Sequence, residues 1–178
     1  MMQGKWLATT AIAMALVATG CDDDDPGPVA PPPAAETFSV TLNGANERPN
    51  PVTTPGQGTA TFTISADKNT LSWTSTITGT NNVFGSHIHI GGTNVAGPIA
   101  FGLFSGPTAN NPAISGSVTR AAFASASVLG ITFDGLLSLM RGGDTYMNVH
   151  TDDGLPPSNT GPGDFPGGEI RGQIIKNP

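Results

Sequence analysis

Cysteine is almost absent from this sequence, because its 178 residues include only one, Cys21. An internal disulfide is therefore excluded. Basic residues are also scarce: seven Lys and Arg, scattered along the chain, stand against 13 Asp and Glu and leave a net charge of −6. Nucleic acid and anionic membrane surfaces are bound through basic patches, so this balance argues against both as partners.

Long apolar runs are missing as well. The run at residues 6–18 is too short and too poorly flanked for an ordinary transmembrane helix. It follows Lys5 and leads through Ala18, Thr19 and Gly20 to Cys21. This order of a positive residue, an apolar segment and small residues before a cysteine resembles a bacterial lipoprotein signal, although such signals more often have Leu where Ala18 stands.

The resemblance implies that residues 1–20 are a signal peptide and that Cys21 becomes the lipidated first residue. The expected location is then the bacterial cell envelope, on the periplasmic face or the cell surface, with a lipid membrane as partner through Cys21. A simple secretory signal cleaved nearby is the alternative. Both alternatives predict an exported chain.

Residues 21–35 have no apolar periodicity, and four consecutive aspartates are followed by a proline-rich segment. Adjacent carboxylates repel and stay solvated, and prolines keep the chain extended, so this segment is predicted to be a disordered tether. The folded domain is expected to occupy residues 36–178. One domain is typical of a chain of this length.

The composition of the domain favours short strands joined by turns, because Gly and Pro number 24 and 16 and charged residues are only 11%. Alternating apolar and polar residues predict strands at 37–42, 58–65 and 71–77, among about eight in all. Such regular spacing indicates an all-β fold, an antiparallel sandwich or partly closed barrel. One short helix is predicted at 133–141, after Thr132 as N-cap and before Gly142 and Gly143.

All three histidines lie in two alternating segments, residues 86–90 and 146–151. Period-two alternation places side chains on opposite faces of a strand. The apolar residues expected to face the core are Ile88, Ile90, Met147 and Val149. The histidines, His87, His89 and His150, are then expected to share the outer face of the sheet.

Two imidazoles at i and i+2 of one strand can approach one metal ion, and a third can come from a paired neighbour. Three neutral imidazoles with an open position suit copper or, less well, zinc. The alternative is that the histidines have a structural role, forming hydrogen bonds on a polar face of the sheet without any metal. Asn148 and Glu169 are candidates to support the metal ligands from outside.

Four ordered motifs resemble the CHRD domain, which is named for chordin and also occurs in many bacterial secreted proteins. The resemblance spans about residues 37–175, and Asn50 departs from the usual pattern by separating Pro49 from Pro51. It implies an immunoglobulin-like or superoxide-dismutase-like β-sandwich of poorly defined activity. The motifs are residues 38–49, His87-Ile88-His89, residues 146–151 and residues 166–173.

The His-x-His segment is also similar to the copper half-site of copper-zinc superoxide dismutase. That enzyme's fourth copper histidine, disulfide and zinc-loop histidines have no counterpart here, so full dismutase activity is not expected. The Gly-x-Ser-x-Gly elbow typical of many hydrolases is also absent. The sequence therefore favours a non-enzymatic module that binds an unidentified protein or glycan, with a copper- or zinc-binding or redox protein that uses the three histidines as the alternative.

Two further groups of polar residues are interpreted structurally. Glu169 and Arg171 lie on one face of the last strand and are expected to pair with each other, or Arg171 with Glu47 across the sheet. Asp152 and Asp153 could bind calcium or act as an acid and base pair, but their Gly/Pro-rich surroundings favour a turn.

Overall fold

The computed structural model describes residues 33–178. The predicted signal peptide, the predicted lipidation site Cys21 and most of the predicted tether lie outside these residues. No helix in the described part is long and apolar enough to cross a membrane. The strands are β1 (Glu36–Asn43), β2 (Gln57–Ile64), β3 (Thr70–Thr78), β4 (Val83–Ile90), β5 (Ile99–Ala109), β6 (Ile114–Thr119), β7 (Thr145–Thr151), β8 (Ile170–Gln173) and β9 (Ile175–Lys176).

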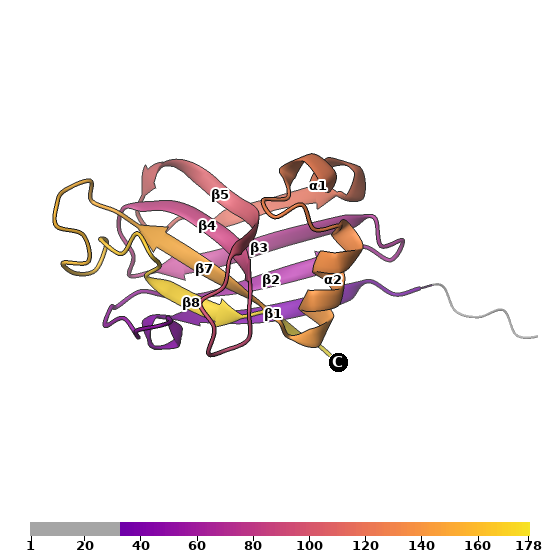
Figure 1. Ribbon diagram of the computed structural model, residues 1–178, viewed down its shortest axis with the longest axis horizontal. Helices are drawn as coiled ribbons and strands as arrows, with labels where there is room; N and C mark the ends of the chain where they lie inside the picture. The colour runs from indigo at the N-terminus through magenta and orange to yellow at the C-terminus, as the bar shows by residue number, and fades with distance from the viewer. Residues whose placement is uncertain (1–32) are drawn as a thin grey trace, which may run out of the picture. The chain divides into compact units, whose positions relative to one another are not determined.

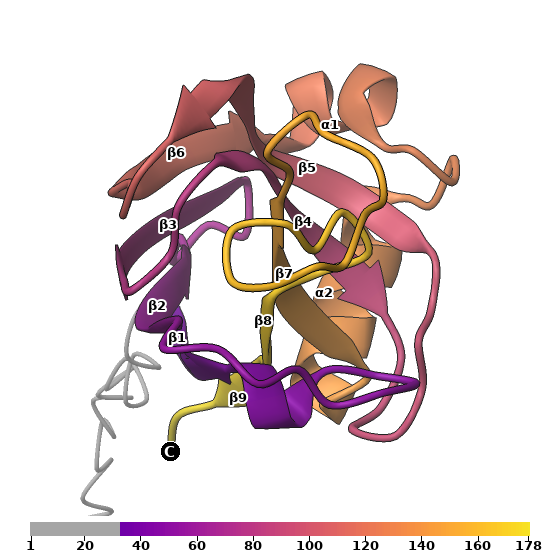
Figure 2. The same cartoon turned by 90° about the vertical axis from the view of Figure 1, so that its left-hand side faces the viewer.

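The strands form one antiparallel sheet in the order β5-β4-β7-β8-β1-β2-β3-β6, with β9 beside β1. The sheet curls until β5 and β6 come near each other, so that its two halves face each other across the core (Figure 2). The predicted antiparallel β fold is confirmed, and the nearly closed sheet combines features of a sandwich and of a barrel.

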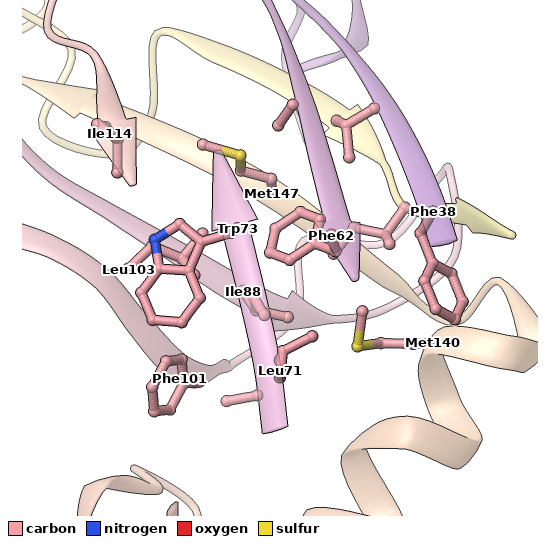
Figure 3. Close-up of a cluster of buried hydrophobic side chains, with 14 of the residues drawn as sticks. Phe38, Phe62, Leu71, Trp73, Ile88, Phe101, Leu103, Ile114, Met140 and Met147 are labelled. Atoms are coloured by element: carbon pink, nitrogen blue, oxygen red, sulfur yellow. The ribbon is translucent and has the colours of Figure 1, made fainter. Parts of the chain in front are cut away.

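The core is built by the alternation visible in the sequence. In β1, Phe38, Val40 and Leu42 are buried, whereas the residues between them are exposed. Phe38 lies opposite Phe62 of β2 in the strand register. These side chains pack with those from the other half of the sheet, including Ile88 and Met147 (Figure 3). Burying a large apolar side chain stabilises the fold by about 1.5–3 kcal/mol.

The predicted helix is present as α2 (Phe133–Gly142). The Thr132 side chain accepts a hydrogen bond from the Gly135 N–H, and Gly143 ends the helix with φ of 75°, a conformation that glycine adopts easily. The helix lies at one end of the sheet (Figure 1), and its apolar face belongs to the core cluster. The buried residues of that face are Phe133, Leu136, Leu137 and Met140.

A second helix, α1 (Arg120–Ala126), was not predicted from the sequence. Phe123 is its one buried residue, so it has no apolar periodicity by which to recognise it. Thr119 caps its N-terminus by accepting a hydrogen bond from the Ala122 N–H. A short 3-10 helix, η1 (Gly44–Asn46), follows β1.

Candidate metal centre

The two strands that carry the histidines are neighbours in the sheet. The antiparallel register of β4 and β7 places Gly85 opposite His150, His87 opposite Asn148 and His89 opposite Tyr146. The side chains of alternate residues, Ile88, Met147 and Val149, are buried in the core. The three imidazoles therefore share the face of the sheet that points away from the core.

The three imidazoles converge on one point. Ring centroids are 4.8 Å apart for His87 and His150, 5.8 Å for His87 and His89, and 5.8 Å for His89 and His150. One nitrogen from each ring lies within 4.8 Å of the other two. Three atoms at that spacing are at most about 2.8 Å from a common centre, so an inward shift of under about 1 Å gives ordinary metal–nitrogen distances of about 2.0 Å.

The face is less exposed than the sequence suggests. His89 and His150 are 7% and 6% exposed, and only His87 is half-buried. The 91–97 and 152–168 loops cover the two buried rings, because each loop offers a backbone carbonyl to one of them. The site expected on the outer face of the sheet is therefore covered by two loops. Alternation within the strands does not reveal this cover.

These two carbonyls determine which nitrogen carries the proton in His89 and in His150. His89 Nδ1 lies 2.9 Å from Gly97 O, and His150 Nδ1 lies 3.0 Å from Pro166 O. A carbonyl oxygen accepts but does not donate, so each Nδ1 is the protonated nitrogen and each Nε2 keeps its lone pair. Both Nε2 atoms and Nδ1 of His87 are buried without a hydrogen-bond partner. Each ring thus keeps one unpartnered nitrogen.

The rings are neutral at neutral pH. Burial, with a smaller effect of the neighbouring imidazoles, lowers the pKa of His87 to about 4. Burial also lowers the pKa of His89 to about 4, against a hydrogen bond to Gly97 that raises it, and lowers the pKa of His150. At His89 and His150, where Nε2 carries no proton, a metal ion binding at pH 7 would therefore not need to displace one.

Tyr146 holds the 91–97 loop in place over His89. Its ring is stacked on the His89 ring, with centroids 4.8 Å apart and planes at 13°. Its hydroxyl accepts a hydrogen bond from the Gly97 N–H at 2.9 Å and donates one to Gly97 O at 3.2 Å. Arg171 lies over the other face of the ring, 3.4 Å from its centroid, and donates to the carbonyls of Gly92 and Val95, both at 2.8 Å.

The expected pairing of Glu169 with Arg171 requires a correction. Glu169 is fully buried and accepts hydrogen bonds from Thr54 Oγ1, from Thr151 Oγ1 at 2.7 Å and from the Gly163 N–H at 3.0 Å. Its oxygens are satisfied by neutral donors, while Arg171 is directed at loop carbonyls. The positions of Glu169 and Arg171 on one strand face did not decide their partners, because donors from two loops and from Thr151 of β7 lie closer to Glu169.

Glu47, from the segment after η1, lies beside Asn148. Its carboxylate accepts from Asn148 Nδ2 at 3.3 Å, and its other oxygen is buried without a partner. Burial raises the pKa of Glu47 to about 7, against the lowering effect of the Arg171 charge. Glu47 also lines a groove of about 680 Å³ between the 47–53 and 159–168 segments, with Phe165 on its wall. It forms no ion pair with Arg171 within residues 33–178.

The turn interpretation of Asp152 and Asp153 fits the structure, since their side chains accept from the Gly154 and Leu155 N–H groups at 2.7 and 2.9 Å. Folding also brings Asp164 to them, with one oxygen of each carboxylate within 4.8 Å of the others. No feature of the sequence pointed to Asp164.

Tyr146 was also missed as a site residue, although its alternation with Asn148 and His150 could have placed it on the same face. The carbonyls of Gly97 and Pro166 carry no such signal, since every residue has one.

A sequence model of the CHRD domain family matches residues 38–174 of this chain. No curated protein and no solved structure matches it. The matched range includes all three histidines, Glu47, Asn148, Glu169 and Arg171.

Proposed function

The chain belongs to the CHRD domain family, and we propose that it is a non-enzymatic binding module whose sheet holds one transition-metal ion on His87, His89 and His150. Two observations support this proposal: one nitrogen of each ring lies within 4.8 Å of a nitrogen of the other two, and each ring has one buried nitrogen without a hydrogen-bond partner. Leaving a buried polar atom without a partner costs about 1–3 kcal/mol. A single ion accepting all three lone pairs would remove that cost.

Copper is the proposed metal and zinc the second choice. Three neutral imidazoles bind both ions, and the order of intrinsic affinities among divalent first-row metals favours copper. The carbonyls of Gly97 and Pro166 orient two of the rings in the manner of the outer-sphere acceptors found at histidine metal sites. A site with three protein ligands keeps an open coordination position, as catalytic sites do, but here a binding role is proposed.

The test is metal analysis of the purified full-length protein after exposure to Cu²⁺ and Zn²⁺, followed by X-ray absorption spectroscopy. We expect one equivalent of metal with imidazole ligands. Because the sequence has only three histidines, any imidazole signal comes from this site. His89→Ala is expected to lower affinity by at least about 100-fold, corresponding to about 3 kcal/mol of binding free energy.

Asp153→Asn is the matched control, because it alters the other group of potential ligands and leaves the histidines intact. It is expected to bind metal as the wild type does. Absence of stoichiometric metal in the wild type, or equal binding by the His89→Ala variant, contradicts the proposal.

We also propose that the module is exported and anchored to a membrane of the cell envelope through lipidated Cys21. The signal-like residues 1–20 and the Asp- and Pro-rich tether support this proposal. The full-length protein is expected to partition into the detergent phase in Triton X-114 extraction, and Cys21→Ser is expected to move it to the aqueous phase. Equal partitioning of both proteins contradicts lipid anchoring.

The groove beside Glu47 supports a second candidate ligand, a protein segment or a glycan. Its volume of about 680 Å³ and its mixed polar and apolar lining, including Phe165, fit such ligands. A glycan or peptide array probed with the wild type and with Phe165→Ala tests this candidate. Binding that the substitution removes supports it, and an array without any such signal contradicts it.

A further inference from the structure

Arg171 is a buried cation that forms no ion pair within the described residues. Its residue is 2% exposed, and its two terminal nitrogens donate to the carbonyls of Gly92 and Val95. The ion pairs within residues 33–178 use other basic residues, namely Lys68, Arg120, Arg141 and Lys176. Buried charges in proteins are usually paired, so an unpaired one indicates that something else supplies the opposite charge.

Arg171 faces a small cavity together with a second guanidinium. The cavity has a volume of about 80 Å³ and is lined by Asn46, Arg48, Thr93, Arg171 and Gln173. Arg48 donates through one terminal nitrogen to the Ala45 and Glu47 carbonyls. A guanidinium has five N–H groups, so both arginines retain donors beyond these contacts.

The two positive charges act on each other. Burial lowers the pKa of Arg171, the charges of Tyr146 and Glu47 raise it, and Arg48 lowers it by a smaller effect, so the two guanidinium groups are close enough to repel. Placing an anion between two such groups would turn that repulsion into attraction on both sides. Paired guanidinium groups favour carboxylate and phosphate oxygens because their N–H groups match two oxygens at once.

We propose that this cavity, between Arg48 and Arg171, binds a small oxyanion, a carboxylate or a phosphate group. A cavity of about 80 Å³ accommodates an oxyanion of four or five heavy atoms, since one water needs about 10–15 Å³. Asn46 and Thr93 also line the cavity, Thr93 with a hydroxyl donor and Asn46 with a second amide N–H beyond the one that it donates to Arg171 O at 3.2 Å. No histidine lines this cavity, and anion binding there requires no metal.

Glu47 is the internal alternative to a bound anion, because its charge acts on both arginines. It makes no ion pair with either within residues 33–178, and its carboxylate is directed at Asn148. If it were the counter-ion, Glu47→Gln would leave the cavity more positive. The oxyanion site therefore predicts equal or tighter anion binding in that variant.

The experiment is thermal unfolding of the metal-free full-length protein at pH 7 in 20 mM sodium phosphate, 20 mM sodium acetate or sodium chloride, at matched ionic strength. We expect phosphate or acetate to raise Tm by about 4 °C over chloride, as for a site with a Kd of about 1 mM. Whichever anion gives the larger shift identifies the recognised group. Isothermal titration with that anion gives the affinity directly.

Arg48→Gln tests the site, because it removes one guanidinium that is only half-buried. It is expected to abolish the shift, and Arg48→Lys is expected to restore part of it. Lys176→Gln is the matched control, since it removes one positive charge on an exposed strand and should leave the shift unchanged. Equal responses of the wild type and Arg48→Gln, or no shift in the wild type, overturn the proposal.

Discussion

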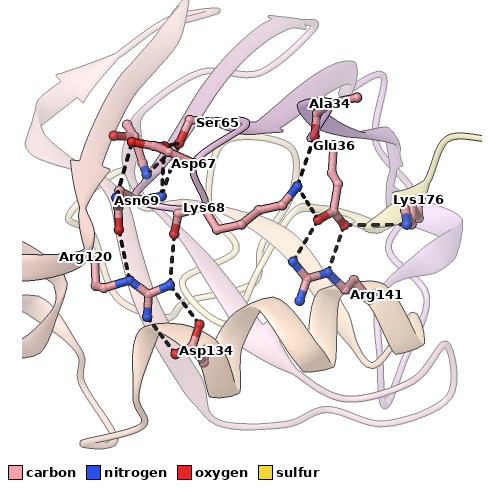
Figure 4. Close-up of polar contacts among 11 residues, drawn as sticks. Ala34, Glu36, Ser65, Asp67, Lys68, Asn69, Arg120, Asp134, Arg141 and Lys176 are labelled. Carbon is pink, nitrogen blue, oxygen red and sulfur yellow. Dashed lines mark hydrogen bonds and ion pairs between the residues drawn. The ribbon is translucent and has the colours of Figure 1, made fainter. Parts of the chain in front are cut away.

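Two polar clusters of this protein are built in opposite ways. At the start of β1, the Glu36 carboxylate accepts from Arg141 through two hydrogen bonds of 2.8 Å and pairs with Lys68 at 2.8 Å and Lys176 at 3.5 Å (Figure 4). On the histidine face, by contrast, three imidazole nitrogens, one oxygen of Glu47 and the charge of Arg171 have no such partner in the described part of the chain.

The difference distinguishes polar residues that connect parts of the fold from polar residues whose hydrogen-bonding groups have no partner in the described chain. The Glu36 cluster joins β1 to α2, to β9 and to the turn between β2 and β3, so its contacts explain its presence. The histidine face is more deeply buried yet less satisfied. Because an unsatisfied polar group costs more free energy the more deeply it is buried, the second arrangement is the one that the proposed metal ion would stabilise.

Gly97→Ala is expected to have the largest effect on the histidine face. A Cβ at this position would lie 1.6 Å from Ile90 O, so the 91–97 loop would have to move away from His89 and Tyr146. We expect unfolding free energy to fall by about 4 kcal/mol and metal affinity to fall by about 100-fold. Chemical denaturation of the apo protein and competitive metal titration measure the two effects.

Gly92→Ala provides the control in the same loop, because a Cβ there meets nothing within 4 Å. It should leave both quantities near their wild-type values. If the two variants behaved alike, the Gly97 carbonyl would not be what organises the metal site.

Glu47→Gln should change the pH dependence of stability. The pKa of Glu47 is raised to about 7 in the folded protein from 4.5, so the folded state holds this proton more tightly than the unfolded state. The stabilisation is complete below about pH 4.5 and is lost as pH rises through about 7, by about 3 kcal/mol. A neutral glutamine removes this loss, so the variant should gain stability relative to wild type as pH rises.

The difference between the two proteins is the quantity to measure, by urea unfolding at pH 5 and pH 8. His87 and His89 titrate in the opposite sense, because their lowered pKa values of about 4 give stability above pH 6.5 that is lost toward pH 4. Their contribution cancels in the comparison. A pH-independent difference would show that Glu47 does not retain its proton.

Glu36→Gln should have the smallest effect on stability of these substitutions and no effect on the histidine face. Hydrogen bonds from Arg141 and Lys68 hold the pKa of Glu36 well below its usual range, so its contribution is present above about pH 4.5 and is lost in acid. The side chain is 14% exposed and its partners are more exposed, so we expect a loss of about 1 kcal/mol at pH 7.

Metal binding should remain unchanged in Glu36→Gln, because the cluster contacts none of the histidines. Parallel measurements of unfolding free energy and metal affinity test both halves of this expectation. Reduced metal affinity would mean that the two clusters are coupled.

The sequence was informative wherever a side chain's direction follows from its own strand. The burial of Phe38 and Ile88 and the common face of the histidines followed from period-two alternation, and α2 from its apolar face and caps. The helix α1 lacks such a pattern. The partners of Glu169 also escaped prediction, because Thr54 and Gly163 come from loops whose path local pattern does not determine.

The sequence by itself determined which residues face the core and which face away, since alternation is a property of the local backbone. It also determined the family, through motifs that it spells directly. Only the tertiary structure decided that loop carbonyls fix the tautomers of His89 and His150, and that Arg171 is buried without an ion pair within residues 33–178. Those features depend on segments that are distant in the chain and meet only when the sheet closes and the loops fold over it.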